Sequence, residues 1–281
     1  MLHTDNVITC KAAKQQGKKL RIVSALTNSI LLTAFAAVTA AMAATPERHA
    51  YFGGLHVHTG WSVDTYQKGL LSSPEDAYRF ARGEEMSHIT GEKIRLASGP
   101  LDFLAVTDHS EYMGMGRTII IDKDSPLYQT ELARRSESPD PAVTVPARME
   151  VFNSVEQNIP IPELLTPELR SYPWQQAIRI ADRFYEPNKF TTFAGFEWTG
   201  EADKAILHRV VLFGSDAALP DIPYSAFDSS EPEALWDWLD QLRTDGAMVL
   251  AIPHNANLSD GLMFPTSIDG APLPNEYAVQ R

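Results

Sequence analysis

Several short apolar runs in this chain stop at a histidine or a carboxylate, and this pattern limits the folds that the chain can adopt. The runs 101–106, 190–196 and 247–252 are followed by Asp108-His109, Glu197 and His254. Continuous apolar strands with polar residues at their carboxyl ends are typical of parallel sheets whose faces are covered by helices. The pattern therefore predicts an α/β fold with a functional site at one edge of its sheet.

The remaining segments complete this α/β pattern. Two more strands are expected at 51–58, which ends on the second histidine of His56-Val57-His58, and at 208–213, which begins with His208. Helices are expected after Ser73-Pro74, over 173–186 and from Pro232 to about Gly246, from their capping residues and apolar spacing. The polar segments 84–100 and 115–172 predict loops and short helices.

Five of the eight histidines lie at edges of these expected strands. In a strand, residues i and i+2 point to the same side, so His56 and His58 can reach one metal ion together. A set of imidazoles and carboxylates without thiolates suits Zn, Mn or Fe. The expected metal ligands are His56, His58, Asp64, His109, Glu197, His208 and His254.

Each of these residues also has a simpler interpretation. A single histidine of this kind is more often a hydrogen-bonded core residue, and Glu197 could be a surface carboxylate that caps a turn. Asp64 could be an ordinary turn residue. Asp108, the candidate catalytic residue, could be a metal ligand or a group that orients a histidine ring. The shared position at strand ends favours the metal site.

Residues 1–43 have the features of a cleaved secretory signal peptide. Basic residues end at Arg21, an apolar run starts at Ile30, and Ala41-Met42-Ala43 has the small-x-small pattern of a cleavage site. We therefore expect a periplasmic or secreted protein whose mature part, 44–281, has no stable membrane span. Cys10 would be removed with the signal, which excludes disulfides and thiolate ligands in the mature chain.

The charge of the chain restricts its partners. The sequence has 24 Lys and Arg against 36 Asp and Glu, and without residues 1–43 these become 19 and 35, a net charge of −16. Such a surface repels nucleic-acid backbones, so we expect no nucleic-acid partner. A small anionic substrate would need local positive charge, which bound divalent metal ions would supply.

These segments resemble the PHP (polymerase and histidinol phosphatase) superfamily of metal-dependent phosphoesterases, and more closely the DUF3604 family within it. The resemblance extends from about Tyr51 to Phe264. It rests on FGGLHVHT (52–59) with Ser62 and Asp64, SPEDAYRFA (73–81), PLDFLAVTDHSEYMG (100–114), GFEWT (195–199) and IPHN (252–255).

The resemblance implies a distorted (β/α)₇ TIM-like barrel with two or three metal ions at the carboxyl-terminal mouth. His56 and His58 would hold the first metal, His109 the second, and Glu197 would bridge metals. Asp64 falls where many PHP enzymes have a histidine, and His208 and His254 match later histidine ligands. PHP proteins also have an Asp-x-His pair near the end of the barrel. No such pair follows His254, so we expect 44–281 to be the N-terminal part of a longer, truncated domain.

The function expected from these observations is metal-dependent hydrolysis, with a phosphate ester as substrate and a metal-activated water as nucleophile. Two alternatives remain. An amidohydrolase-like enzyme would cleave C–N or C–O bonds, although that family expects a bridging lysine where this chain has Glu197. A non-catalytic, exported metal-binding protein would need no closing ligands at all.

Overall fold

A five-stranded sheet carries the expected strands from which most of the candidate ligands come. The computed structural model describes residues 48–67, 70–88, 90–115, 123–268, 271–273 and 275. The expected signal peptide, with Cys10, lies outside these residues. In the described part of the chain, no helix is both long and apolar enough to cross a membrane.

The sheet contains both parallel and antiparallel pairs. Its strand order is β1 (Gly53–Gly54), β4 (Phe103–Ala105), β5 (Thr191–Trp198), β8 (Arg209–Phe213) and β9 (Val249–Pro253). The pairs β1–β4 and β4–β5 are parallel, whereas β5–β8 and β8–β9 are antiparallel. The start of β8 therefore lies at the same edge as the ends of the other four strands.

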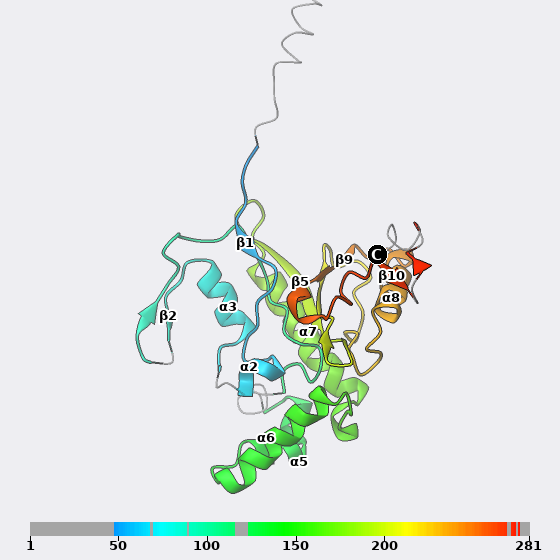
Figure 1. Cartoon of the computed structure of the whole chain (residues 1–281). Coiled ribbons are helices and arrows are strands. Elements are labelled where there is room, and N and C mark those ends of the chain that lie inside the picture. The colour runs from blue at the N-terminus through cyan, green and yellow to red at the C-terminus, as the bar shows by residue number, and fades with distance from the viewer. Residues whose placement is uncertain are drawn as a thin grey trace, which may run out of the picture. The chain divides into compact units, whose positions relative to one another are not determined.

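The expected (β/α)₇ barrel is wrong. The sheet is curled but open, with β1 and β9 as its edges among the described residues (Figure 1). A barrel of that type needs a helix after each parallel strand. Between β5 and β8 the chain instead forms the hairpin of β6 (Glu201–Ala202) and β7 (Ala205–Ile206), whose two-residue turn has positive φ at Asp203 and Lys204.

Helices cover the sheet and form a separate group beside it. The α-helices are α2 (Val63–Gln67), α3 (Pro74–Ala81), α5 (Glu131–Ser136), α6 (Pro141–Glu156), α7 (Pro167–Phe184) and α8 (Pro232–Thr244). The 3₁₀ helices are η1 (Pro126–Gln129), η2 (Pro162–Leu164) and η3 (Ala256–Leu258). Two further antiparallel pairs join β2 (Met86–Ser87) to β3 (Lys93–Ile94) and β10 (Ser267–Ile268) to β11 (Ala271–Pro272). Helix α7 packs against β5 and α8 against β9, while α5 and α6 pack on each other (Figure 1).

Three apolar clusters hold these elements together. The largest joins α7 and α8 to the sheet and includes Trp174, Phe196 and Leu239. A second joins α3, β4 and the end of α7 around Tyr78, and a third fills the space among α5, α6 and η2. Since successive strand residues point to opposite faces, Glu197 lies on the face opposite to that of Phe196 and Trp198.

Two helices differ from the sequence expectation. Helix α6 occupies 16 residues of the segment expected to be loops and short helices. Its apolar residues do not form one stripe, because Val145 and Met149 are exposed while Val151 is buried. Helix α7 starts at Pro167 with Thr166 as its N-cap, so Pro173, which suggested a first helical residue, lies inside the helix.

Helix α3 begins where the sequence predicts, and its cap gives a test. The Ser73 side chain accepts the Asp76 amide N–H, while the Asp76 carboxylate accepts the Ser73 N–H. We expect Ser73→Ala to lower the free energy of unfolding by about 1 kcal/mol, measured by urea denaturation. Ser87→Ala on the β2–β3 hairpin is the control, and equal effects of the two changes would contradict the role of the cap.

Candidate metal centre

The sheet edge brings together the side chains that the sequence predicts to be metal ligands. His56 and His58 follow β1, His109 follows β4, Glu197 ends β5 and His254 follows β9. His208 precedes β8, whose antiparallel direction takes it to the same edge. Asp64 joins them from the first turn of α2. All seven residues therefore meet at one place.

Glu197 is the centre of the cluster. Its Oε2 lies 2.9 Å from His56 Nε2 and 2.7 Å from His58 Nε2. Its Oε1 lies 2.8 Å from His208 Nδ1 and 2.9 Å from His254 Nε2. The residue is 1% exposed. Burial alone would raise the pKa of Glu197, but its contacts with the four rings outweigh burial and lower the pKa.

The spacing of the donor atoms fits metal ions. Two groups have their ligand atoms within 4.8 Å of one another, namely His56, Glu197 and His254, and His58, His109 and Glu197. Two donors on one tetrahedral Zn lie about 3.4 Å apart when each bond is about 2.1 Å long. Glu197 belongs to both groups, as a bridging carboxylate would. His56 Nε2 also lies 2.9 Å from His58 Nε2, so these two rings are near enough to share one ion, as the resemblance implies.

Two ring nitrogens of the cluster make no hydrogen bond among the described residues. His208 Nε2 and His254 Nδ1 are buried and make no hydrogen bond within the described residues. A buried polar atom without a partner is costly and calls for an explanation, for which an ion is one candidate. Among the described residues, the donor set thus fits a divalent metal in its chemistry and in its spacing.

The two aspartates occupy different places. Asp64 Oδ1 lies 3.6 Å from His58 Nδ1 and 3.7 Å from His109 Nε2. Asp108 instead binds the segment that follows His58. Its Oδ1 accepts the Thr59 N–H at 2.5 Å, and its Oδ2 accepts the Thr59 hydroxyl at 2.7 Å. Burial raises the pKa of Asp108 to about 6 against these two hydrogen bonds. Asp108 thus ties the end of β4 to the segment that carries His56 and His58.

The protonation of the rings depends on their place in the cluster. Burial lowers the pKa of His58, but its contact with Glu197 and the charges nearby raise it overall. The same balance, with Glu197 and Glu201 as partners, raises the pKa of His208 to about 9. Burial dominates for His109 and lowers its pKa to about 3. At neutral pH a metal ion that binds the His208 ring would therefore displace a proton.

Four residues near the rings received no role from the sequence. The Ser62 hydroxyl contacts His58 Nδ1 at 2.8 Å and accepts the His109 amide N–H at 3.2 Å. Thr199 Oγ1 lies 2.5 Å from His109 Nδ1, and Glu201 Oε1 lies 3.8 Å from His208 Nε2. The fully buried Glu111 follows His109 by two residues. Ser62, Glu111 and Thr199 lie within the motifs that carry the family resemblance, next to candidate ligands in the sequence. That closeness in sequence was the only signal that could have pointed to them.

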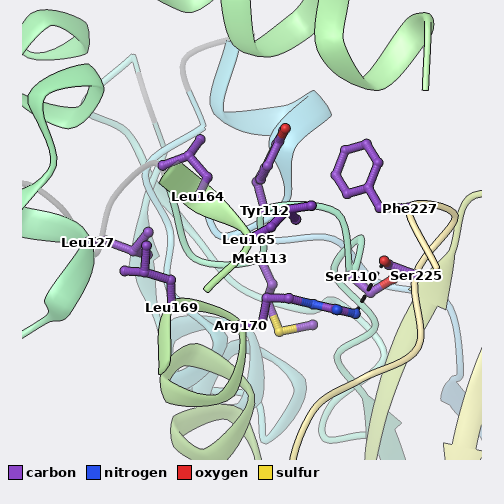
Figure 2. Close-up of a pocket in the computed structure, with 10 residues that line it drawn as sticks. All are labelled: Ser110, Tyr112, Met113, Leu127, Leu164, Leu165, Leu169, Arg170, Ser225 and Phe227. Atoms are coloured by element: carbon purple, nitrogen blue, oxygen red, sulfur yellow. Dashed lines mark hydrogen bonds between the residues drawn. The ribbon is translucent and has the colours of Figure 1, made fainter. Parts of the chain in front are cut away.

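Among the described residues, one small and one larger cavity border the segment that follows His109. The first is lined mainly by apolar side chains from η2, α7 and the segment after His109, and Arg170 crosses it to contact Ser225 (Figure 2). Its accessible space is about 10 Å³, room for one water molecule.

The second cavity, of about 170 Å³, shares Thr199 and Glu201 with the surroundings of the cluster. Its lining includes four acidic residues and one lysine, namely Glu111, Glu156, Glu201, Asp203 and Lys204. An anionic group would be repelled from this cavity unless cations at the cluster offset its charge. The lining of this cavity is therefore predominantly acidic.

Comparison with known proteins gives one match. The family model described as "Protein of unknown function (DUF3604)" matches residues 45–281. The searches of curated proteins and of solved structures gave no match.

Proposed function

The chain belongs to the DUF3604 family, and we propose that this member is a metal-dependent hydrolase that acts on phosphate esters. The observation that carries the proposal is the buried Glu197 carboxylate with four imidazoles within 2.9 Å of its oxygens. We also propose that the family is a branch of the PHP superfamily, because the His-x-His and Thr-Asp-His motifs both contribute rings to this cluster.

Two or three divalent ions, Zn, Mn or Fe, are the proposed cofactors. His56 and His254 would hold one ion, His58 and His109 another, and Glu197 would contact both. When bound, such ions polarise phosphoryl oxygens and lower the pKa of water enough to make it a nucleophile. They also supply the positive charge that an anionic substrate needs beside acidic side chains.

The remaining roles belong to the side chains themselves. Asp108 holds Thr59 and so fixes the distance between the segment of His56 and His58 and that of His109. Asp64 is the carboxylate at the outer side of the cluster, with a side chain 37% exposed and Oδ1 near two rings. We assign it the role of holding a proton at Oδ1 during turnover.

The place of action is part of the proposal. The signal-like segment 1–43 supports export to the periplasm or beyond, and the acidic mature chain argues against nucleic acid as a partner. Both points come from the sequence, and detection of the mature chain in a periplasmic extract would test the first.

His56→Ala tests the proposed activity. The full chain, loaded with Zn, Mn or Fe, should hydrolyse p-nitrophenyl phosphate or bis-p-nitrophenyl phosphate, and the variant should lose metal and more than about 100-fold in rate. Losing even a group that only orients a ligand costs about 10–100-fold. His88→Ala is the matched control, because His88 is exposed and contacts Thr90.

The same assay separates the alternatives. Full activity of chelated protein would overturn the metal-dependent proposal. Cleavage of amide or carboxylic ester substrates alone would favour the amidohydrolase-like reading. Metal binding without cleavage of any substrate on the panel would favour a metal-binding protein.

A further inference from the structure

The second cavity, of about 170 Å³, borders the cluster at two points. Thr199 and Glu201 contribute to its lining. Thr199 Oγ1 lies 2.5 Å from His109 Nδ1, and Glu201 Oε1 lies 3.8 Å from His208 Nε2. The part of a substrate that extends from the cluster on this side therefore meets the cavity first.

The size of the cavity restricts its occupant to a short group. One water molecule needs about 10–15 Å³ of such space, so a cavity of about 170 Å³ holds a group of several non-hydrogen atoms. It is smaller than the pockets of about 300–1,000 Å³ that enclose drug-sized ligands. The cavity thus fits the small alcohol part of a phosphate ester.

The charges around the cavity favour a cation. Besides Glu111, its described lining includes the carboxylates of Glu156, Glu201 and Asp203 against the ammonium group of Lys204. These three carboxylates outnumber the lysine even when Glu111 carries no charge, so the preference does not depend on the protonation of Glu111. A positively charged group is attracted to such a lining and an anionic group is repelled from it.

Glu156 lies at the end of helix α6 where a carboxylate is unfavourable. It is the last residue of this 16-residue helix, and the last turn contains no basic residue. The carbonyl end of a helix carries partial negative charge, which disfavours a carboxylate and favours a cation. Helix stability therefore gives no reason for Glu156, whereas a cation bound beside it would interact favourably with the carboxylate and with the helix end.

Glu111 supplies a separate indication of a ligand. Glu111 is 1% exposed and contributes to the lining of the same cavity. Its Oε1 accepts the Ala226 amide N–H at 2.6 Å, but its Oε2 makes no hydrogen bond within the described residues. A buried polar atom without a partner calls for an explanation, and a hydrogen-bond donor in the cavity would provide one.

We propose that this cavity is the subsite for the leaving group of the substrate, and that it binds a short alkyl group that ends in a primary ammonium. An ammonium has three N–H donors and no acceptor, so it matches a lining rich in carboxyl oxygens. The phosphate would lie at the cluster. The leaving-group role rests on the proposed function, whereas the binding of an amine does not.

The first test is the binding of ethanolamine to the full, metal-free chain, followed by NMR titration. Ethylene glycol, which has a hydroxyl in place of the ammonium, is the matched neutral probe. We expect ethanolamine to bind at least about 10-fold more tightly than ethylene glycol. The double variant Glu156→Gln, Asp203→Asn should lose about 10-fold in ethanolamine affinity, the loss expected for one hydrogen bond to a charged group. Glu163→Gln, an exposed change on η2, is the control.

Stability measurements separate binding from a structural role. Glu156 and Asp203 are exposed, and asparagine tolerates the positive φ of 49° at position 203. In urea denaturation, Glu156→Gln should keep or raise the free energy of unfolding, because it removes a negative charge from the negative end of α6. Lys204→Gln removes positive charge from the lining and should tighten ethanolamine binding.

Kinetics with the metal-loaded chain test the leaving-group role. Hydrolysis of O-phosphoethanolamine consumes one water, breaks the P–O bond to the alcohol and releases ethanolamine and inorganic phosphate. We expect its kcat/KM to exceed that of 2-hydroxyethyl phosphate by about 10-fold, and the double variant to remove this preference.

Equal affinity for ethanolamine and ethylene glycol, or unchanged ethanolamine binding in the double variant, would overturn the amine site. Equal kcat/KM for the two esters would overturn the leaving-group role. Ethanolamine binding without hydrolysis of either ester would refute the proposed function and leave the amine site standing. Hydrolysis without ethanolamine binding would do the reverse.

Discussion

Glu197→Gln is expected to remove bound metal and to lower the free energy of unfolding of the metal-free chain by about 3–5 kcal/mol. That is the usual cost when one partner of a buried ion pair is removed and the other stays buried. Four ring nitrogens lie within 2.9 Å of this carboxylate, and its side chain is 2% exposed. Urea denaturation in the presence of a chelator, with metal analysis of the untreated protein, measures both effects.

The destabilisation by Glu197→Gln should depend on pH. The pKa of His208 rises from 6.5 to about 9 in the folded chain, so its ion pair with Glu197 contributes fully below pH 6.5 and is lost as the pH rises through 9. The difference in stability between parent and variant should thus shrink between pH 6.5 and 9.

The exposed Glu168 on α7 offers the matched control Glu168→Gln, which should change stability by less than about 0.5 kcal/mol. Metal content and stability equal to those of the parent in Glu197→Gln would refute the central role of this carboxylate.

Trp174→Ala is expected to cost about 3–5 kcal/mol of stability, the usual loss for a buried tryptophan. The Trp174 ring is fully buried on α7 and packs on Phe196 and Phe213 with centroids 5.6 and 5.9 Å away. Its Nε1–H donates to the Pro220 carbonyl at 2.8 Å. The free energy of unfolding of a domain is about 5–15 kcal/mol, so this loss approaches the whole stability of a domain at the low end of that range.

Thermal and urea unfolding measure the effect of Trp174→Ala, and Met248→Ala, whose side chain is largely exposed, is the control. Trp174→Phe keeps most of the ring but loses the hydrogen bond, so it should fall between the two. A loss below about 1 kcal/mol in Trp174→Ala would show that α7 does not anchor the sheet.

The site was more predictable from the sequence than the fold around it. Apolar runs that end on Glu197 or His254 mark a sheet edge whichever way the strands pair. The same holds for His208, although it lies just before its strand and not after it. Strand direction is not contained in an apolar run, so nothing in the runs themselves corrected the barrel that the resemblance implied, and β8 is antiparallel.

Side-chain contacts between distant segments could not be predicted from the sequence either. The Thr59–Asp108 and Thr199–His109 contacts join residues 49 and 90 positions apart, and they exist only once the strands pair. The family resemblance to DUF3604, in contrast, needed only local motifs and is confirmed. Helix α6 was missed because its apolar residues lack helical spacing.

The strands of the mixed sheet pair over very different distances along the chain, and the residues of the site fall into two groups accordingly. Trp198 pairs with Arg209 across one small hairpin, whereas Gly53 pairs with Phe103 and Phe103 with Thr191 across long intervening segments. Closing a longer loop costs more entropy, and folding slows as contacts become more distant in sequence. Glu197 and His208 therefore belong to a locally connected half, and His56, His58 and His109 to a half that joins at a higher entropic cost. A ligand that needs both halves binds only the fully assembled sheet, which makes its binding a measure of completed folding.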